Sequence, residues 1–182
     1  MDGEFQVRPA RLADAEGIYA LIREHTTELV PRSLGNVVEN IDRFLVAVGP
    51  DGALAGCIAY QVWPEIGDPL KATVELQSVA VRSTCRRKGI GSMMVKGALE
   101  RVRALAPADV TVLTLTPEFF ATLGFREIPK TRIMHKLYTG CINCTKHTDP
   151  FTCPEKAMAL ELALASNGKV TAAHMNVIAH SV

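Results

Sequence analysis

A basic turn containing two glycines separates an apolar strand segment from a long helical one. Residues 73–81 are rich in β-branched and apolar side chains, and from Ile90 to Pro107 apolar residues recur every three or four positions. The turn between them reads Arg86-Arg87-Lys88-Gly89-Ile90-Gly91-Ser92. A helix that begins in this way points unpaired backbone N–H groups and the positive end of its dipole at one place. The pattern predicts a phosphate or pyrophosphate site.

Two common phosphate-binding loops do not match this turn. A dinucleotide-binding fingerprint needs a small residue three positions after its second glycine, and that position holds Met94. A phosphate-loop NTPase needs Gly-Lys-Ser/Thr, which does not occur in the sequence. The remaining alternative is a solvated basic turn whose glycines serve only the helix geometry.

Charge and composition exclude several functions. The 182 residues include 20 Lys and Arg against 19 Asp and Glu, so a bound anion must be held locally and no nucleic-acid partner is expected. Hydrophobic residues make up 48% of the chain, as in ordinary folded proteins. No apolar run reaches the roughly 18 to 20 residues that cross a bilayer, and Met1-Asp2-Gly3-Glu4 is unlike a secretory signal. We expect a single cytoplasmic domain without a membrane partner.

Periodicity and turn signals predict alternating strands and helices along the rest of the chain. The second helix should bury Leu34, Val37, Val38 and Ile41, with Ser33 as its N-cap. The elements expected are a strand at 5–8, helices at 12–28 and from 33 onward, a β-hairpin of 44–48 and 54–62, a loop at 63–69, a strand at 110–115, a short helix from Thr116-Pro117 to Gly124, a strand at 133–138 and a helix at 154–165, with no clear period in 169–182.

Three of the five cysteines lie close together near the C-terminal end. Cys141, Cys144, His147 and Cys153 lie within thirteen residues and form a Cys₃His set that suits a structural zinc ion. A reducible disulfide and free thiols that pack the loop are the alternatives. The remaining two, Cys57 and Cys85, stand alone, which does not fit a secreted disulfide framework.

The spacing Arg86-x-x-Gly89-x-Gly91 resembles the pyrophosphate loop Q/R-x-x-G-x-G/A of the GCN5-related N-acetyltransferase (GNAT) family. Arg8-Pro9-Ala10 before the first helix, Gly56-Cys57 in the hairpin and the element from Pro117 to Phe125 resemble the same family in the same order, over about residues 5–138. The resemblance implies an α+β GNAT fold, a mixed, mostly antiparallel twisted sheet with helices on both faces. Residues 1–140 would form this domain, and residues 141–182 a cysteine-containing loop, C-terminal helix and tail packed on it.

The resemblance implies acetyl-CoA as the cosubstrate. Its pyrophosphate would lie on the N–H groups of residues 87–92, and its pantetheine arm would pair with backbone at 78–81 like an extra strand. The residues expected to bind it are Ser78, Val79, Ala80, Val81, Arg86, Arg87, Lys88, Gly89, Ile90, Gly91, Ser92, Phe119 and Phe120.

The same resemblance suggests which residues carry the chemistry. Glu75 lies eleven residues before Arg86, the spacing at which several family members carry a catalytic glutamate, and is the expected general base. The alternative is a carboxylate that only orients Gln77 or pairs with an arginine. The backbone N–H of Val79 would stabilise the oxyanion. The tyrosine that often protonates the departing thiolate is replaced by Phe120, which leaves Tyr138 as a substitute.

Three short segments resemble the amino-acid N-acetyltransferases of the N-acetylglutamate synthase type. They are Pro31-Arg32-Ser33-Leu34, Pro117-Glu118-Phe119-Phe120, and Lys136-Leu137-Tyr138 followed by Cys141-x-x-Cys144. This resemblance implies acetylation of the α-amine of glutamate for arginine biosynthesis, with Arg32, Ser33 and Lys136 as candidates for binding its two carboxylates. Other amines (an amino acid, a polyamine or a protein lysine), an acyl-CoA sensor without catalysis, and a metal- or redox-responsive regulator remain alternatives, and a homodimer is left open.

Overall fold

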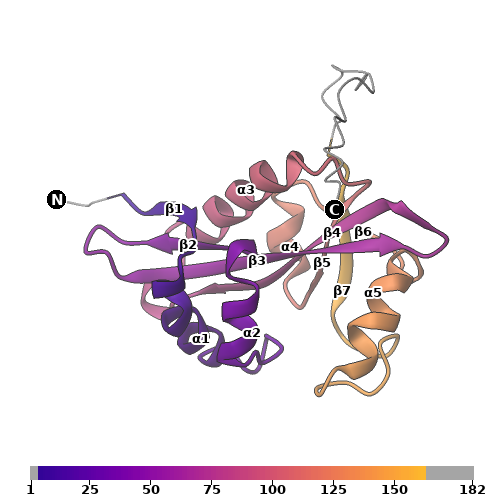
Figure 1. Cartoon of the computed structure of the whole chain (residues 1–182), viewed down its shortest axis with the longest axis horizontal. Helices are drawn as coiled ribbons and strands as arrows, with labels where there is room; N and C mark the ends of the chain where they lie inside the picture. Colours follow the sequence, from indigo (N-terminus) through magenta and orange to yellow (C-terminus); the bar gives the residue numbers. More distant parts are fainter. Residues whose placement is uncertain (1–3, 163–182) are drawn as a thin grey trace, which may run out of the picture.

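A seven-stranded sheet forms the centre of the protein in the computed structural model, which describes residues 4–162 (Figure 1). The strand order is β1-β2-β3-β4-β5-β7-β6, and only β4 and β5 pair in parallel. The expected mixed, mostly antiparallel sheet is therefore confirmed. The strands are β1 (Gln6–Pro9), β2 (Phe44–Val48), β3 (Leu54–Glu65), β4 (Asp68–Val81), β5 (Val110–Thr114), β6 (Arg126–Glu127) and β7 (Lys156–Leu160).

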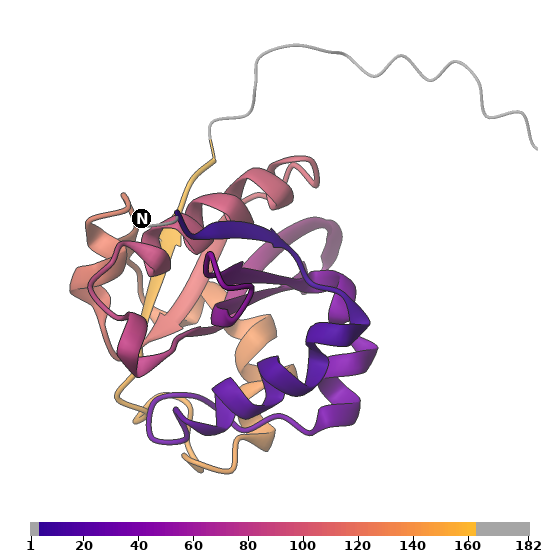
Figure 2. The same ribbon diagram turned by 90° about the vertical axis from the view of Figure 1, so that its left-hand side faces the viewer.

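Helices cover both faces of this sheet (Figure 2). The side chains of β2 alternate, so that Leu45 packs with α3 on one face while Phe44 packs with α1 on the other. One core thus lies under α3 and α4, and a second lies under α1 and α2. The helices are α1 (Ala15–Arg23), α2 (Leu34–Glu39), α3 (Ile90–Arg103), α4 (Pro117–Ala121) and α5 (Met134–Thr139), with 3₁₀ turns at Leu12–Asp14, Ile41–Arg43, Ser83–Cys85, Lys130–Ile133 and Cys141–Asn143.

The strand predicted at 133–138 is wrong, because this segment forms the end of a 3₁₀ turn and then α5. Ile133 and Leu137 are four residues apart, so a helix places both on one side, where they pack against Ala157. Contact with the sheet therefore decides between two conformations that the short apolar pattern allows.

The helix predicted at 154–165 is also wrong, because Lys156–Leu160 forms β7 between β5 and β6. Its residues 157–159 are all buried, since both faces of this inner strand are covered. A continuous apolar run of this length does not distinguish a buried strand from a buried helix. Positions 163–165 of the predicted helix, and the tail at 169–182, lie outside the described residues.

Three smaller expectations also need correction. The loop predicted at 63–69 is a hairpin, in which β3 extends to Glu65 and β4 begins at Asp68. The first helix ends at Arg23 instead of continuing to residue 28. The short helix α2 buries only Val37, while Leu34 and Val38 are exposed, because a helix of six residues presents a single turn to α1.

Several local predictions are confirmed. The side chain of Ser33 caps α2 by accepting a hydrogen bond of 3.0 Å from the backbone N–H of Asn36. The hairpin of β2 and β3 and the helix that follows the basic turn both form as expected. Among residues 4–162, no helix combines the length and apolarity needed to cross a bilayer.

Candidate active site

A cleft opens where β4 and β5 separate. The two strands pair only through Val74–Leu76 and Val110–Val112. Against β3, strand β4 carries one extra residue between Gln77 and Ala80, and Ser78 within this bulge has a positive φ of 52°. A bulge bends its strand, so β4 turns away from β5 beyond Leu76. The resulting cleft has a volume of about 580 Å³ and is lined by residues 76–81 of β4 and 112–116 around the end of β5.

The basic turn closes one end of this cleft. Arg87 and Gly89 both have positive φ, 62° and 77°, and Gly89 is the N-cap of α3. The N–H groups of the first helical turn have no partners within the helix, and they belong to the cleft-lining residues Ile90, Gly91 and Ser92. Together with the helix dipole and the side chains of Arg86 and Arg87, they give this end of the cleft a positive character that suits an anion.

Of the other residues expected to bind the cosubstrate, two phenylalanines line the cleft and a lysine lies elsewhere. Phe119 and Phe120 line the cleft, and a Cβ added at Gly91 would lie 3.2 Å from Phe119 Cζ, so Gly91 favours this close packing of α3 on α4. The side chain of Lys88 instead lies over the Phe5 ring, 5.7 Å from its centroid, beside a separate surface hollow.

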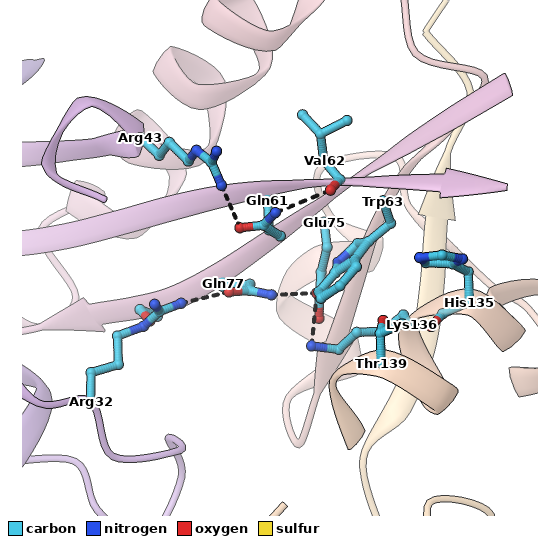
Figure 3. A network of polar contacts seen from close by, with 11 residues as sticks. Arg32, Arg43, Gln61, Val62, Trp63, Glu75, Gln77, His135, Lys136 and Thr139 are labelled. Carbon is cyan, nitrogen blue, oxygen red and sulfur yellow. Dashed lines mark hydrogen bonds and ion pairs between the residues drawn. The ribbon is translucent and has the colours of Figure 1, made fainter. Parts of the chain in front are cut away.

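A chain of polar side chains runs along β4 beside the cleft (Figure 3). Arg32 donates from Nε to Ser78 Oγ at 2.9 Å and from Nη2 to Gln77 Oε1. Gln77 in turn donates to Oε2 of Glu75. The same oxygen receives Lys136 Nζ at 2.9 Å. Arg32 comes from the segment before α2 and Lys136 from α5, so the network joins both ends of the fold.

The network places a buried carboxylate between several donors. Glu75 is only 4% exposed, and besides the hydrogen bond from Gln77 and the ion pair with Lys136 it accepts a hydrogen bond of 2.7 Å from Trp63 Nε1. The Lys136 ammonium also lies 5.0 Å from the Trp63 ring centroid. The pKa of Arg32 is lowered, because the effect of burial exceeds the opposing effect of the nearby Glu75 carboxylate. The guanidinium still stays charged. The carboxylate charge is therefore compensated by neighbouring cations.

The structure brings together Glu75, Arg32 and Lys136, which the sequence places far apart. Ser33 lies next to Arg32 but is exposed, and its oxygen already accepts the capping hydrogen bond. Tyr138 is 59% exposed on α5 and does not line the cleft. Of the residues predicted to bind the cosubstrate, those that line the cleft are Ser78, Val79, Ala80, Val81, Arg86, Arg87, Gly89, Ile90, Gly91, Ser92, Phe119 and Phe120.

The predicted zinc site does not form. The described part of the chain contains no group of three or more His, Cys, Asp or Glu side chains that could hold a metal ion, so Cys141, Cys144, His147 and Cys153 do not make a ligand set. These cysteines are free thiols, and burial raises the pKa of Cys141 to about 11. The loop is held instead by Lys130, whose Nζ donates to the carbonyls of Pro150 and Cys153 at 2.7 and 2.6 Å.

Sequence reasoning missed several residues of the site. Trp63 fell in a predicted loop, although an indole beside a buried carboxylate is a common donor. His25 falls in the helix predicted at 12–28, and it lines the cleft with Thr114 and Glu155. These contacts cross between elements distant in the sequence, and no local pattern indicates them.

Comparisons with known proteins agree with this geometry. The profile of the acetyltransferase (GNAT) family matches residues 15–125. An uncharacterised N-acetyltransferase of Chlorobaculum tepidum is 34% identical over 158 residues, which cover 86% of this chain and 96% of that protein. An amino-acid acetyltransferase of Mycobacterium tuberculosis is 34% identical over 136 residues, or 72% of this chain and 74% of that one.

Solved structures share the fold. A Mycobacterium tuberculosis protein crystallised with CoA and NLQ is 28% identical, with a TM-score of 0.71 over 87% of this chain and 99% of that chain. N-acetylglutamate synthase of Neisseria gonorrhoeae, crystallised with coenzyme A and N-acetyl-glutamate, has a TM-score of 0.69 at 23% identity. This match covers 90% of this chain and 36% of the synthase chain. Four findings agree, namely the bulged strand, the open cleft, the basic turn at residues 86–92 (below called the anion turn) and the matching family profile. The chain belongs to the acetyltransferase (GNAT) family.

Proposed function

We propose that this protein transfers the acetyl group of acetyl-CoA to the α-amine of an amino acid with a second carboxylate, glutamate being the first candidate. The anion turn suits a pyrophosphate, and the free edge of β4 at 78–81 suits the amides of a pantetheine arm. A relative named as an amino-acid acetyltransferase and a neighbour crystallised with CoA support the same choice.

The observation that carries the choice of acceptor is the pair of cations at the two ends of the Gln77–Glu75 hydrogen bond. A guanidinium has five N–H donors, and three hydrogen bonds from Arg32 to the protein are present, to Ser78, Gln77 and Asn36. An ammonium has three donors, and Lys136 forms an ion pair with Glu75 at 2.9 Å. Both cations therefore retain donors for the carboxylates of an acceptor, and the Arg32 fork suits a carboxylate.

The proposed reaction is direct attack within a ternary complex. The acceptor's amine loses a proton, its nitrogen forms a bond to the acetyl carbonyl carbon, and the carbon–sulfur bond breaks to release the CoA thiolate. Glu75 takes the proton through a water molecule, and the Val79 backbone N–H stabilises the oxyanion. Phe120 offers no hydroxyl to the leaving group, which a thiolate tolerates because thiol pKa values are only about 8.5.

Thiol release from acetyl-CoA, measured against a panel of free amino acids, polyamines and a lysine peptide, tests this proposal. We expect turnover with glutamate, and a fall of about 100-fold in kcat for Glu75→Gln, the size typical of a lost general base. Calorimetric CoA affinity and circular dichroism of the variant show whether cleft and fold are intact. Turnover that favours the peptide or a polyamine would refute the amino-acid acceptor, and unchanged kcat in Glu75→Gln would refute the base.

Phe120 favours one second candidate, a protein that binds acyl-CoA without catalysis. It is 3% exposed and packs edge-to-face on Phe125 with ring centroids 5.5 Å apart, at the position where a catalytic tyrosine is often found in this family. Tight CoA binding without turnover on any amine would favour this candidate. Turnover that appears in Phe120→Tyr would identify the missing hydroxyl as the cause.

A further inference from the structure

His25 links the end of β4 to the first arginine of the anion turn. It follows α1, is 7% exposed and lines the cleft. Its Nε2 lies 3.1 Å from the carbonyl oxygen of Val81, the last residue of β4. Its Nδ1 lies 3.1 Å from Nη2 of Arg86. Both ring nitrogens are thus engaged, and each partner belongs to the region expected to bind acyl-CoA.

The chemistry of the two partners determines the protonation state of the ring. A guanidinium only donates, so Nδ1 must accept from Arg86. A carbonyl oxygen only accepts, so Nε2 must carry the hydrogen and donate to Val81. This geometry requires the neutral imidazole with its proton on Nε2.

We infer that His25 is a positioning residue that holds the Arg86 guanidinium at the phosphate end of the cleft, and that protonation of the ring releases it. The affinity of the anion turn for a phosphate would then depend on His25, which follows α1 and lies outside the turn. The inference rests on the proposed binding of CoA in the cleft. It goes beyond that proposal by naming His25 as the residue that positions the Arg86 side chain.

The charged groups around the ring define what protonation does. Arg86 faces it from the anion turn, and Glu28 faces it from its own segment, with Oε2 3.6 Å from Nδ1. The strand β4 presents only the Val81 carbonyl, which does not titrate. A proton on Nδ1 would turn the acceptor into a donor that repels Arg86 and pairs with Glu28. Affinity for the phosphate end of the ligand should therefore fall when the ring is protonated.

A double-mutant cycle on ligand binding tests the positioning role. The Kd of dephospho-CoA is measured by calorimetry for wild type, His25→Phe, Arg86→Ala and the double variant at pH 8. We expect each single change to weaken binding about tenfold and the double variant to bind no more than about twofold weaker than Arg86→Ala, because coupled residues are not additive. Single effects that multiply to about 100-fold would overturn the inference.

A second variant guards against a folding defect in His25→Phe. His25→Asn places an amide oxygen near the Nδ1 position, so it should accept from Arg86 and keep the affinity within about threefold of wild type. If it binds as weakly as the phenylalanine variant while its circular dichroism and thermal midpoint match wild type, the contact to Arg86 is not what matters. If wild type itself binds no CoA, the proposed function fails before this inference is reached.

The pH dependence provides an independent readout. Dephospho-CoA is the probe because it lacks the 3′-phosphate, whose second ionisation near pH 6 would add a pH dependence of its own. As the pH is lowered from 8, we expect the wild-type Kd to rise and the Kd of His25→Asn to change less than about twofold. A flat wild-type profile, or one that persists in the asparagine variant, would refute the release of Arg86 by protonation.

Discussion

Replacing Lys136 with methionine should destabilise the protein strongly, because it leaves the Glu75 carboxylate buried without its cation. The side chains of Lys136 and Glu75 are 17% and 5% exposed, and their charged atoms are 2.9 Å apart. Removing one partner of a buried pair costs about 3–5 kcal/mol. Glu75 keeps its hydrogen bonds from Trp63 and Gln77, so we expect the lower end, about 3 kcal/mol. Domains are stable by about 5–15 kcal/mol, so the loss is easily measured.

Urea unfolding followed by tryptophan fluorescence is the assay, because Trp63 is the sole tryptophan and contacts both members of the pair. Lys156→Met is the matched control, since Lys156 pairs with Glu127 at the same 2.9 Å but with both side chains more than half exposed. Lys156→Met should lower the free energy of unfolding by less than about 1 kcal/mol. Adding Glu75→Gln to Lys136→Met should recover at least half of the loss. A cost for Lys136→Met equal to that of Lys156→Met would refute the buried-pair reasoning.

Three further changes probe the anion turn, the cap of α2 and the acid sensitivity of the fold. Gly89 and Gly52 have φ of +77° and +78°, and an added Cβ would meet no atom within 4 Å at either, so Gly89→Ala and Gly52→Ala should each cost about 1 kcal/mol. Only the first should weaken CoA binding in calorimetry, and equal CoA affinities would argue against the turn as the anion site. Ser33→Ala should cost about 1 kcal/mol in urea unfolding and raise the KM for the acceptor, whereas an unchanged KM would restrict Ser33 to capping. The hydrogen bond from Arg8 lowers the pKa of Asp14, so this pair stabilises the fold above the ordinary carboxyl pKa and its contribution is lost as the pH falls through the lowered value. Arg8→Gln should therefore lower the free energy of unfolding by about 1 kcal/mol at pH 7 and by progressively less as the pH falls through the lowered pKa, and a gap in thermal stability that does not shrink with falling pH would contradict this.

The elements around the anion turn were predictable because local rules govern them. The left-handed φ of Gly89 favours glycine and the hydroxyl of Ser33 suits an N-cap, and neither depends on distant residues. The family's loop pattern at Arg86 to Gly91 lies in one continuous segment, so its resemblance could be seen without a structure.

The two incorrect elements share a physical cause. Residues 133–138 and 156–160 are short apolar runs that suit either a helix or a buried strand, and their own periodicity does not decide between them. The open edge of β5 accepts the second run as β7, and the surface formed around Ala157 accepts the first as α5. The first run thus depends on a surface that the second run helps to build, and the second run depends on the edge of β5.

The sequence by itself determined the order of most elements, the anion turn and the family, because each rests on residues within a few positions of one another. Only the tertiary structure decided that Lys136 meets Glu75, that Arg32 reaches Gln77 across 45 residues, and that the cysteines hold no ligand set. These contacts depend on where the bulge at Ser78 bends β4 and on which faces of the sheet the helices cover. Approach over such distances follows from the packing of the whole fold, and no local pattern of residues encodes it.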